Sequence, residues 1–200
     1  VVTAGQNTAI AENTANSTSV LTVAATDGDA TATFSSWTIT GGNTDVDGDT
    51  NLAFAINGAT GEITVNDADD LDREQIANFT LTVTVSDGTN TSVAETVTIN
   101  INDVNEFTPV VTAGQNTALA ENTANSTSVL TVAATDGDAT ATFSSWTITG
   151  GNTDVDGDTN LAFAINGATG EITVNDADDL DREQIANFSL TVTVSDGTNT

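Results

Sequence analysis

The sequence is a tandem repeat. Residues 1–91 return as residues 110–200 with two changes, Ile10 to Leu119 and Thr80 to Ser189. An offset of 109 residues is the size of one small domain. We therefore expect two domains, 1–109 and 110–200, in which the second lacks a counterpart of 92–109. The near-identity indicates a piece of a longer array, although an engineered duplication would give the same pattern.

Alternation of apolar and polar residues, rich in Thr and Val, predicts β-strands separated by turns such as Asp27-Gly28 and Asp87-Gly88. Residues 69–77 are expected to form a short helical turn. Seven short strands in about 100 residues predict an all-β, immunoglobulin-like sandwich for each unit, with Trp37 in its core. The expected strands of the first unit are 8–12, 19–26, 33–40, 52–57, 61–66, 79–87 and 94–102.

The chain carries 29 acidic and two basic residues, for a net charge of −27, and has neither His nor Cys. Such a surface repels nucleic acid and anionic lipid, so neither is an expected partner. The missing residue types exclude Ser-His-Asp and Cys-His catalysis, ordinary zinc sites and disulfides. No apolar run is long enough to span a membrane, and the residues after Val1 do not resemble a signal peptide, so we expect an internal or processed piece of a protein. We expect no enzyme, because metal binding explains the carboxylates better than catalysis does.

The acidic residues gather where predicted strands end. The strands of a sandwich alternate in direction, so these residues lie at its two opposite ends. If two units stack end to end, the acidic residues at the lower end of the first unit meet those at the upper end of the second. Eight carboxylates would then share the junction, a situation that favours Ca²⁺, which takes six to eight oxygen ligands in irregular geometry. The residues at this junction would be Glu12, Asp72, Glu74, Asp103, Asn105 and Glu106 from the first unit, and Asp136, Asp138 and Asp196 from the second.

The same residues resemble the cadherin repeat, in particular the cadherin-like repeats of large bacterial surface proteins. The resemblance covers both units and rests on several motifs in order. They are Ala11-Glu12-Asn13, Asp27-Gly28-Asp29, Leu71-Asp72-Arg73-Glu74, Val85-Ser86-Asp87-Gly88 and the linker Asp103-Val104-Asn105-Glu106-Phe107-Thr108-Pro109. It implies cadherin-type Greek-key β-sandwich domains, end to end, with calcium in the linker between them.

By this resemblance, Glu12, Asp72, Glu74 and Glu106 would hold two ions, and Asp138 would bridge to a third. Asn105, Asp136 and Asp196 would complete the third site, with main-chain oxygens near Val104 and Phe107. The linker departs from the vertebrate pattern at Glu106, where Asp is usual, and at Phe107, where Asn is usual. The outer ends of the chain carry half-sites, with weak binding or none, at Asp27, Asp29, Asp87, Glu121, Asp181 and Glu183.

A second calcium signal lies inside each unit. Acidic residues at alternate positions followed by Asn are similar to the first half of an EF-hand loop, but the closing Glu and the flanking helices are missing. A polar hairpin loop that hydrogen-bonds to its own carboxylates explains the pattern equally well. The residues are Asp45, Asp47, Asp49 and Asn51 in the first unit, and Asp154, Asp156, Asp158 and Asn160 in the second.

These features predict a calcium-stiffened, rod-like segment of an extracellular protein, such as an adhesin on a bacterial cell surface, with neighbouring repeats as partners. The alternative is a calcium-dependent module that binds polysaccharide or a like protein. Because the second unit stops before the counterpart of 94–102, we also expect its sheet to have an open edge and higher mobility.

Overall fold

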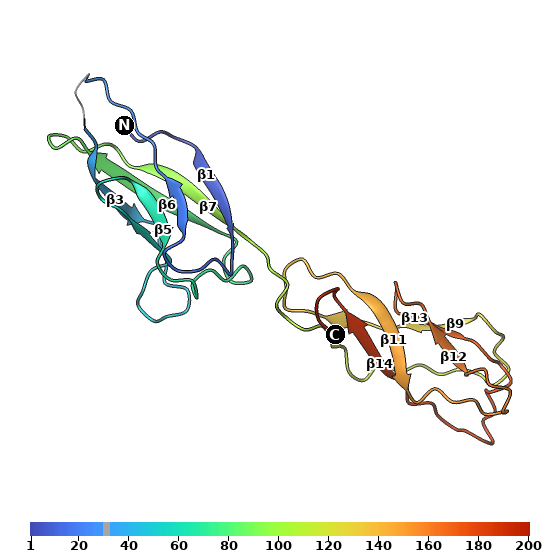
Figure 1. The fold of residues 1–200 in the computed structure, drawn as a ribbon. Coiled ribbons are helices and arrows are strands. Elements are labelled where there is room, and N and C mark those ends of the chain that lie inside the picture. The colour runs from blue at the N-terminus through green and yellow to red at the C-terminus, as the bar shows by residue number, and fades with distance from the viewer. Residues whose placement is uncertain (30–32) are drawn as a thin grey trace. The chain divides into compact units, whose positions relative to one another are not determined.

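The computed structural model describes residues 1–29 and 33–200, and the chain divides into two compact units, Val1–Val104 and Asn105–Thr200. All regular structure among these residues is β-strand, so the expected all-β class is confirmed. The boundary between the units falls inside the predicted linker segment 103–109. Each unit is a body of its own in Figure 1.

The first unit is a sandwich of two sheets (Figure 1). The larger sheet has the order β1-β7-β6-β3 and the smaller one the order β2-β5-β4. The strands of the larger sheet are β1 (Gln6–Ala11), β3 (Ser35–Gly41), β6 (Asn78–Ser86) and β7 (Glu95–Asn102). Those of the smaller sheet are β2 (Ser19–Thr22), β4 (Phe54–Ile56) and β5 (Glu62–Val65).

The start of the chain contributes to both sheets. Val2 forms a bridge to Ala25, just beyond β2, and the chain then moves across to pair β1 with β7. The β1–β7 pair is parallel, with Gln6 opposite Val97, whereas the other paired strands of this unit are antiparallel. As a result, the last residues of β1 and β7 lie side by side at one end of the sandwich, and Glu12 and Asp103 follow them.

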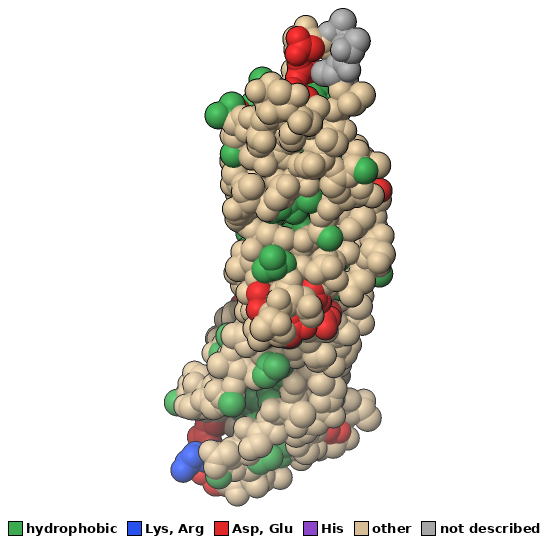
Figure 2. Space-filling model, turned by 90° about the vertical axis from the view of Figure 1, so that its left-hand side faces the viewer, with side chains coloured by type: hydrophobic (Ala, Val, Ile, Leu, Met, Phe, Trp, Pro, Cys, Tyr) green, Lys and Arg blue, Asp and Glu red, His purple; other side chains and the backbone are tan. Residues whose placement is uncertain are grey.

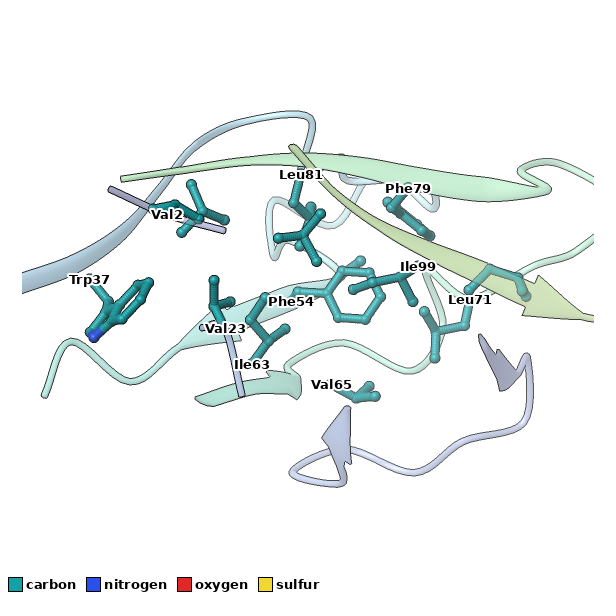
Figure 3. Packing of buried hydrophobic residues seen from close by; sticks show 14 of the residues in the cluster. Val2, Val23, Trp37, Phe54, Ile63, Val65, Leu71, Phe79, Leu81 and Ile99 are labelled. Atoms are coloured by element: carbon teal, nitrogen blue, oxygen red, sulfur yellow. The ribbon is translucent and has the colours of Figure 1, made fainter. Parts of the chain in front are cut away.

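The core lies between the two sheets. Alternate residues of β6 face inward, and Phe79 packs against Phe54 with ring centroids 5.0 Å apart. Figure 3 shows Trp37 at one end of this core and Leu71 at the other, and both are buried. Trp37 and its counterpart Trp146 are therefore core residues, as the sequence predicts, and are not open platforms for a ligand.

The predicted helical turn is present as a single turn. Residues 69–77 form turns in which the Ile76 N–H donates to the Asp72 carbonyl at 2.8 Å, a single helix-like bond that does not propagate. The Asp72 side chain caps this turn, because its Oδ1 accepts the Gln75 N–H at 2.9 Å. Such a bond satisfies a free N–H group at the start of a helical turn. The seven predicted strands are all present, with ends that shift by a few residues.

The second unit keeps the smaller sheet and loses part of the larger one. Its sheets have the orders β12-β13-β9, β11-β14 and β10-β8. Its strands are β8 (Val110–Val111), β9 (Ser128–Thr131), β10 (Ala134–Thr135), β11 (Ser144–Gly150), β12 (Phe163–Ile165), β13 (Glu171–Val174) and β14 (Thr191–Ser195). Residues 115–120, which match β1, form no strand here.

This loss follows from the missing partner strand. In the first unit β7 pairs with both β1 and β6, and residues 110–200 include no counterpart of the segment 92–109 that contains β7. An open groove of about 1310 Å³ lies between segments 111–122 and 185–192 instead. Phe79 is 1% exposed, whereas its counterpart Phe188 is only half-buried. The expected open edge is present, while the expected mobility stays a prediction.

Candidate metal centres

The first unit gathers three carboxylates at the end where β1 and β7 finish. Carboxylate oxygens of Glu12, Glu74 and Asp103 lie within 4.8 Å of one another. Glu12 is held firmly, because Oε2 accepts the Arg73 N–H at 2.7 Å and Oε1 accepts the Val104 N–H. Its side chain is 7% exposed. These two bonds tie the turn after Leu71 and the start of the linker to the end of β1.

Asp72 lies at the start of the same turn. Its two carboxylate oxygens accept the backbone and side-chain N–H groups of Gln75. It therefore neighbours Arg73, whose N–H contacts Glu12, but it is not one of the three clustered carboxylates. The structure thus brings Glu12, Glu74 and Asp103 together and leaves Asp72 engaged with its own turn.

The second unit gathers another three carboxylates, Asp136, Asp138 and Asp196, also within 4.8 Å of one another. The Asp138 Oδ1 atom accepts the Glu106 N–H at 3.1 Å and the Phe107 N–H at 3.3 Å. The linker backbone is therefore bound directly to this cluster through its amides.

Asn199 is a functional candidate that the sequence analysis missed. Its side-chain amide donates to Asn105 Oδ1 at 3.0 Å and to the Phe107 carbonyl at 2.8 Å. Asp196 Oδ1 accepts the N–H groups of Thr198 and Asn199, both at 2.6 Å. Burial acts to raise the pKa of Asp196, but these N–H donors outweigh it and the pKa lies below its usual value. No pattern in the sequence singles out Asn199, because its role depends on contact with the distant linker.

Two carboxylate oxygens of this cluster lack a partner. Asp136 Oδ2 and Asp138 Oδ2 are buried, and neither has a hydrogen-bond partner among the described residues. Buried polar atoms in native proteins are nearly always satisfied, so such an atom calls for an explanation. Anionic oxygens that converge in a buried cluster suit a hard cation such as Ca²⁺. The donor set therefore fits the calcium that the family resemblance implies.

Phe107 packs on the turn that carries Asp136 and Asp138. A Cβ atom added to Gly137 would lie 2.5 Å from the Phe107 ring, so any larger residue there would force the ring to move. Phe107, which the sequence analysis noted as a departure from the vertebrate linker, thus covers the turn of the second cluster. It is 47% exposed.

The half-sites at the outer ends are more open. Asp27 and Asp29 are exposed, whereas Asp138, the counterpart of Asp29, is 7% exposed. Glu121 is exposed, and its bond to the Arg182 N–H has lengthened to 3.4 Å. Asp87, Asp181 and Glu183 complete these half-sites, and backbone and side-chain N–H donors of Asn90 and Gln184 hold the pKa values of Asp87 and Asp181 below the usual value.

A third kind of cluster occupies the loop between β3 and β4. Carboxylate oxygens of Asp45, Asp47 and Asp49 lie within 4.8 Å of one another. Asp45 accepts the Gly48 N–H at 2.6 Å and the Thr50 N–H at 2.9 Å, and Asn51 bonds to Asp49. The counterparts Asp154, Asp158 and Asn160 make the same bonds in the second unit.

Asp47 has an unusual electrostatic setting within this loop. The N–H of Asp49 acts to lower its pKa, but desolvation and the negative charges of Asp49, Asp67 and Asp70 outweigh that bond and raise the pKa. The same causes raise the pKa of Asp156. Asp67 and Asp70 come from the segment after β5, and the sequence analysis did not include them among the candidate ligands.

The negative charge is therefore organised into groups. On the face drawn in Figure 2, acidic side chains gather in separate patches with largely uncharged surface between them. No described segment is a helix that is long and apolar enough to cross a bilayer.

The chain belongs to the cadherin family. The family model "Cadherin domain" matches residues 6–102 and again residues 115–200, so each unit is a cadherin domain. The chain is 35% identical over 198 residues to the fruit fly (Drosophila melanogaster) protocadherin-like wing polarity protein stan. This alignment covers 95% of this chain and 5% of that protein. It is 37% identical over 158 residues to mouse cadherin-23, in an alignment that covers 76% of this chain and 4% of that protein.

Solved structures show the same fold. A crystal structure of three domains of mouse cadherin-23, EC22-24, matches 98% of this chain and 58% of that chain, with a TM-score of 0.63 and 24% identity. The extracellular domain of protocadherin GammaB4 matches 88% of this chain and 29% of that chain, with a TM-score of 0.66 and 20% identity. The chain spans about one twentieth of the length of the curated relatives above.

Proposed function

We propose that the two domains form a calcium-stiffened segment of an extracellular adhesive protein, with calcium bound where one domain continues into the next. The observation that carries this proposal is the pair of buried, unpartnered oxygens on Asp136 and Asp138. Both belong to a cluster that also binds the linker backbone, so an ion there would join the linker to the second domain.

The first domain supports the proposal through its own cluster. Glu12, Glu74 and Asp103 converge where β1 and β7 end, and Glu12 already binds the first linker amide, that of Val104. We therefore assign calcium to each cluster, with Asp72 and Glu106 as additional ligands and the main chain near Val104 and Phe107 supplying oxygens.

Charge explains why the ion matters mechanically. Two like charges 4 Å apart repel by about 1 kcal/mol in water and by about 4 kcal/mol at an effective dielectric constant of 20. Without calcium, repulsion among the clustered carboxylates would favour linker conformations that separate them. With calcium, the same carboxylates become ligands of common ions and hold the linker in one conformation. The ion thus converts a flexible joint into a stiff one.

The affinity expected for such calcium sites indicates where the protein acts. Extracellular calcium modules bind with dissociation constants of about 10⁻⁴–10⁻³ M, a range suited to the calcium level outside cells. We therefore place the segment on a cell surface, with neighbouring repeats as its immediate partners. The bacterial host suggested by the sequence stays a prediction. No exposed tryptophan among the described residues favours a polysaccharide ligand, since Trp37 and Trp146 are buried.

Small-angle scattering with calcium and with a chelator tests this proposal. We expect calcium to narrow the distribution of interdomain distances and to raise the melting temperature of the chain. Asp138→Asn should remove most of both effects, because it replaces a charged ligand at the centre of the second cluster. Asp29→Asn makes the same change at the matching position of the first domain and should leave both effects in place. Scattering and melting curves that are the same with calcium and with chelator would refute the proposal.

A further inference from the structure

Each domain carries a carboxylate cluster that the proposed linker sites do not use. It lies in the loop between β3 and β4 of the first domain and in the matching loop between β11 and β12 of the second. The cluster alone would be compatible with a polar loop that bonds to itself, because the N–H groups of Gly48 and Thr50 already bond to Asp45. A ligand is indicated by a further carboxylate that comes from a different part of the chain.

That carboxylate is Asp70 in the first domain and Asp179 in the second. Both are 0% exposed. Asp70 Oδ1 accepts the N–H groups of Val46 and Asp47, the latter at 3.2 Å, so the side chain is directed at the acidic loop. Asp70 Oδ2 is buried without a hydrogen-bond partner among the described residues, and so is Asp179 Oδ2.

The second domain shows how these carboxylates converge. Oxygens of Asp154, Asp156 and Asp179 lie within 4.8 Å of one another. Asp156 also belongs to a second group of three with Asp158 and Asp176, and Asp176 is 8% exposed. The two groups share Asp156 and together contain five carboxylates. Two of them, Asp176 and Asp179, are buried and come from the segment after β13. In the first domain Asp67 and Asp70 occupy the matching positions.

A fully buried carboxylate with an unpartnered oxygen is costly unless a positive charge compensates it. The chain has two basic residues, and none of the described bonds to Asp70 or Asp179 comes from either of them. A bound cation would satisfy the unpartnered oxygen and would also offset the surrounding carboxylates. Calcium suits the site better than magnesium, because it accepts many carboxylate oxygens without strict octahedral geometry.

We propose that each domain binds a calcium ion of its own between the loop 45–51 (154–160) and the buried carboxylate of Asp70 (Asp179). Asp156 belongs to both groups of the second domain, so Asp156 and its counterpart Asp47 supply the other main ligands. Asp67 and Asp176 support the site from the same segment as the buried carboxylate. The ion would fasten the β3–β4 loop to the segment after β5. This site does not depend on the linker ions.

Calcium titration of the full chain tests the proposal, with the amide signals of Gly48 and Gly157 followed by NMR. Both signals should shift with calcium in the wild type. In Asp70→Asn/Asp179→Asn they should shift only at calcium concentrations at least about tenfold higher, a loss typical for groups that support a metal. Calorimetry should then count one ion fewer per domain. The matched control is Asp69→Asn/Asp178→Asn, which removes the same charge from exposed neighbours and should bind as the wild type does.

A purely structural role for Asp70 predicts a different result. If the carboxylate only held the loop amides, Asp70→Asn would lower the melting temperature equally with chelator and with calcium. Our proposal predicts that the variant is at least as stable as the wild type in chelator and gains less from calcium, since asparagine keeps the Oδ1 acceptor and removes the buried charge. Equal losses, or unchanged calcium binding, would overturn it. Asp138→Asn separates the two proposals, because it should leave the Gly48 and Gly157 shifts intact.

Discussion

Identical side chains serve different purposes in the two domains. Asp29 and Asp138 occupy the same position in the repeat, but only Asp138 has the linker amides of Glu106 and Phe107 within reach. Asp29 is exposed, and its N–H donates to Asp27 within the same turn. The surroundings therefore decide which copy of a carboxylate can become a buried ligand.

Gly137 offers a test of the Phe107 contact. Gly137→Ala would place a Cβ atom 2.5 Å from the Phe107 ring, and overpacking of this kind typically costs about 1–3 kcal/mol. We expect lower stability in denaturant titrations and weaker calcium binding at the second cluster. At the matching Gly28 an added Cβ atom meets no described atom within 4 Å, so Gly28→Ala should change neither quantity. Equal effects of the two substitutions would contradict the contact.

Gly42 is the first residue after β3, where the backbone turns close to β6. Its φ is +73°, and an added Cβ atom would lie 1.9 Å from the Thr80 carbonyl oxygen of β6. Gly42→Ala therefore combines backbone strain with a backbone clash, and we expect it to cost about 3 kcal/mol or more in the free energy of unfolding. Gly88→Ala measures the backbone strain without a clash, because the φ of Gly88 is +95° and an added Cβ atom meets nothing within 4 Å. We expect it to cost about 1–2 kcal/mol. Urea unfolding of both variants measures the difference, and similar losses would count against the clash.

Among the strands, β7 determines whether two of its neighbours form. It supplies the buried residues Val97, Ile99 and Ile101 and pairs with strands on both sides. Without its counterpart, the second domain loses the matches of β1 and of the first part of β6, although their sequences are nearly unchanged. Strand formation at these positions is therefore a result of pairing and not of local propensity alone.

Restoring this strand should stabilise the second domain. A copy of residues 92–109 appended after Thr200 would fill the groove between segments 111–122 and 185–192. Because burial of each Val or Ile side chain contributes about 1.5–3 kcal/mol, we expect a gain of several kcal/mol. Hydrogen exchange should show new protection at 115–120 and 187–190. An appended copy with Ser at the three apolar positions should give little protection, and equal protection from both copies would argue against strand insertion.

For the chain as a whole, the net charge of −27 makes the response to ions informative. With calcium removed by a chelator, raising sodium chloride from about 0.1 M to about 1 M shortens the Debye length from about 10 Å to about 3 Å. We expect this screening to raise the melting temperature partly, but to leave it below the value reached with millimolar calcium. Calorimetric scans across both series measure this, and salt that fully replaces calcium would mean that the clusters act only through general repulsion.

Much of the fold could be predicted because its signals are local. Alternation along β6, the Asp-Gly turns, and the near-identical return of the sequence after 109 residues place strands, core and domains without knowledge of contacts. The gathering of Glu12, Glu74 and Asp103 was also expected, since strand direction assigns them to one end. The helical turn expected within 69–77 is present as one turn, which the Asp72 side chain caps.

By itself, the sequence determined that this chain is two all-β cadherin domains with carboxylates grouped at strand ends and in one loop. Only the tertiary structure decided which carboxylates are buried and what they face. Asp70 stands 24 residues from Val46, and Asn199 stands 94 residues from Asn105, so neither contact leaves a periodic trace in the sequence. The physical reason is that burial and the loss of hydrogen-bond partners are properties of packing, and packing joins segments that are distant along the chain.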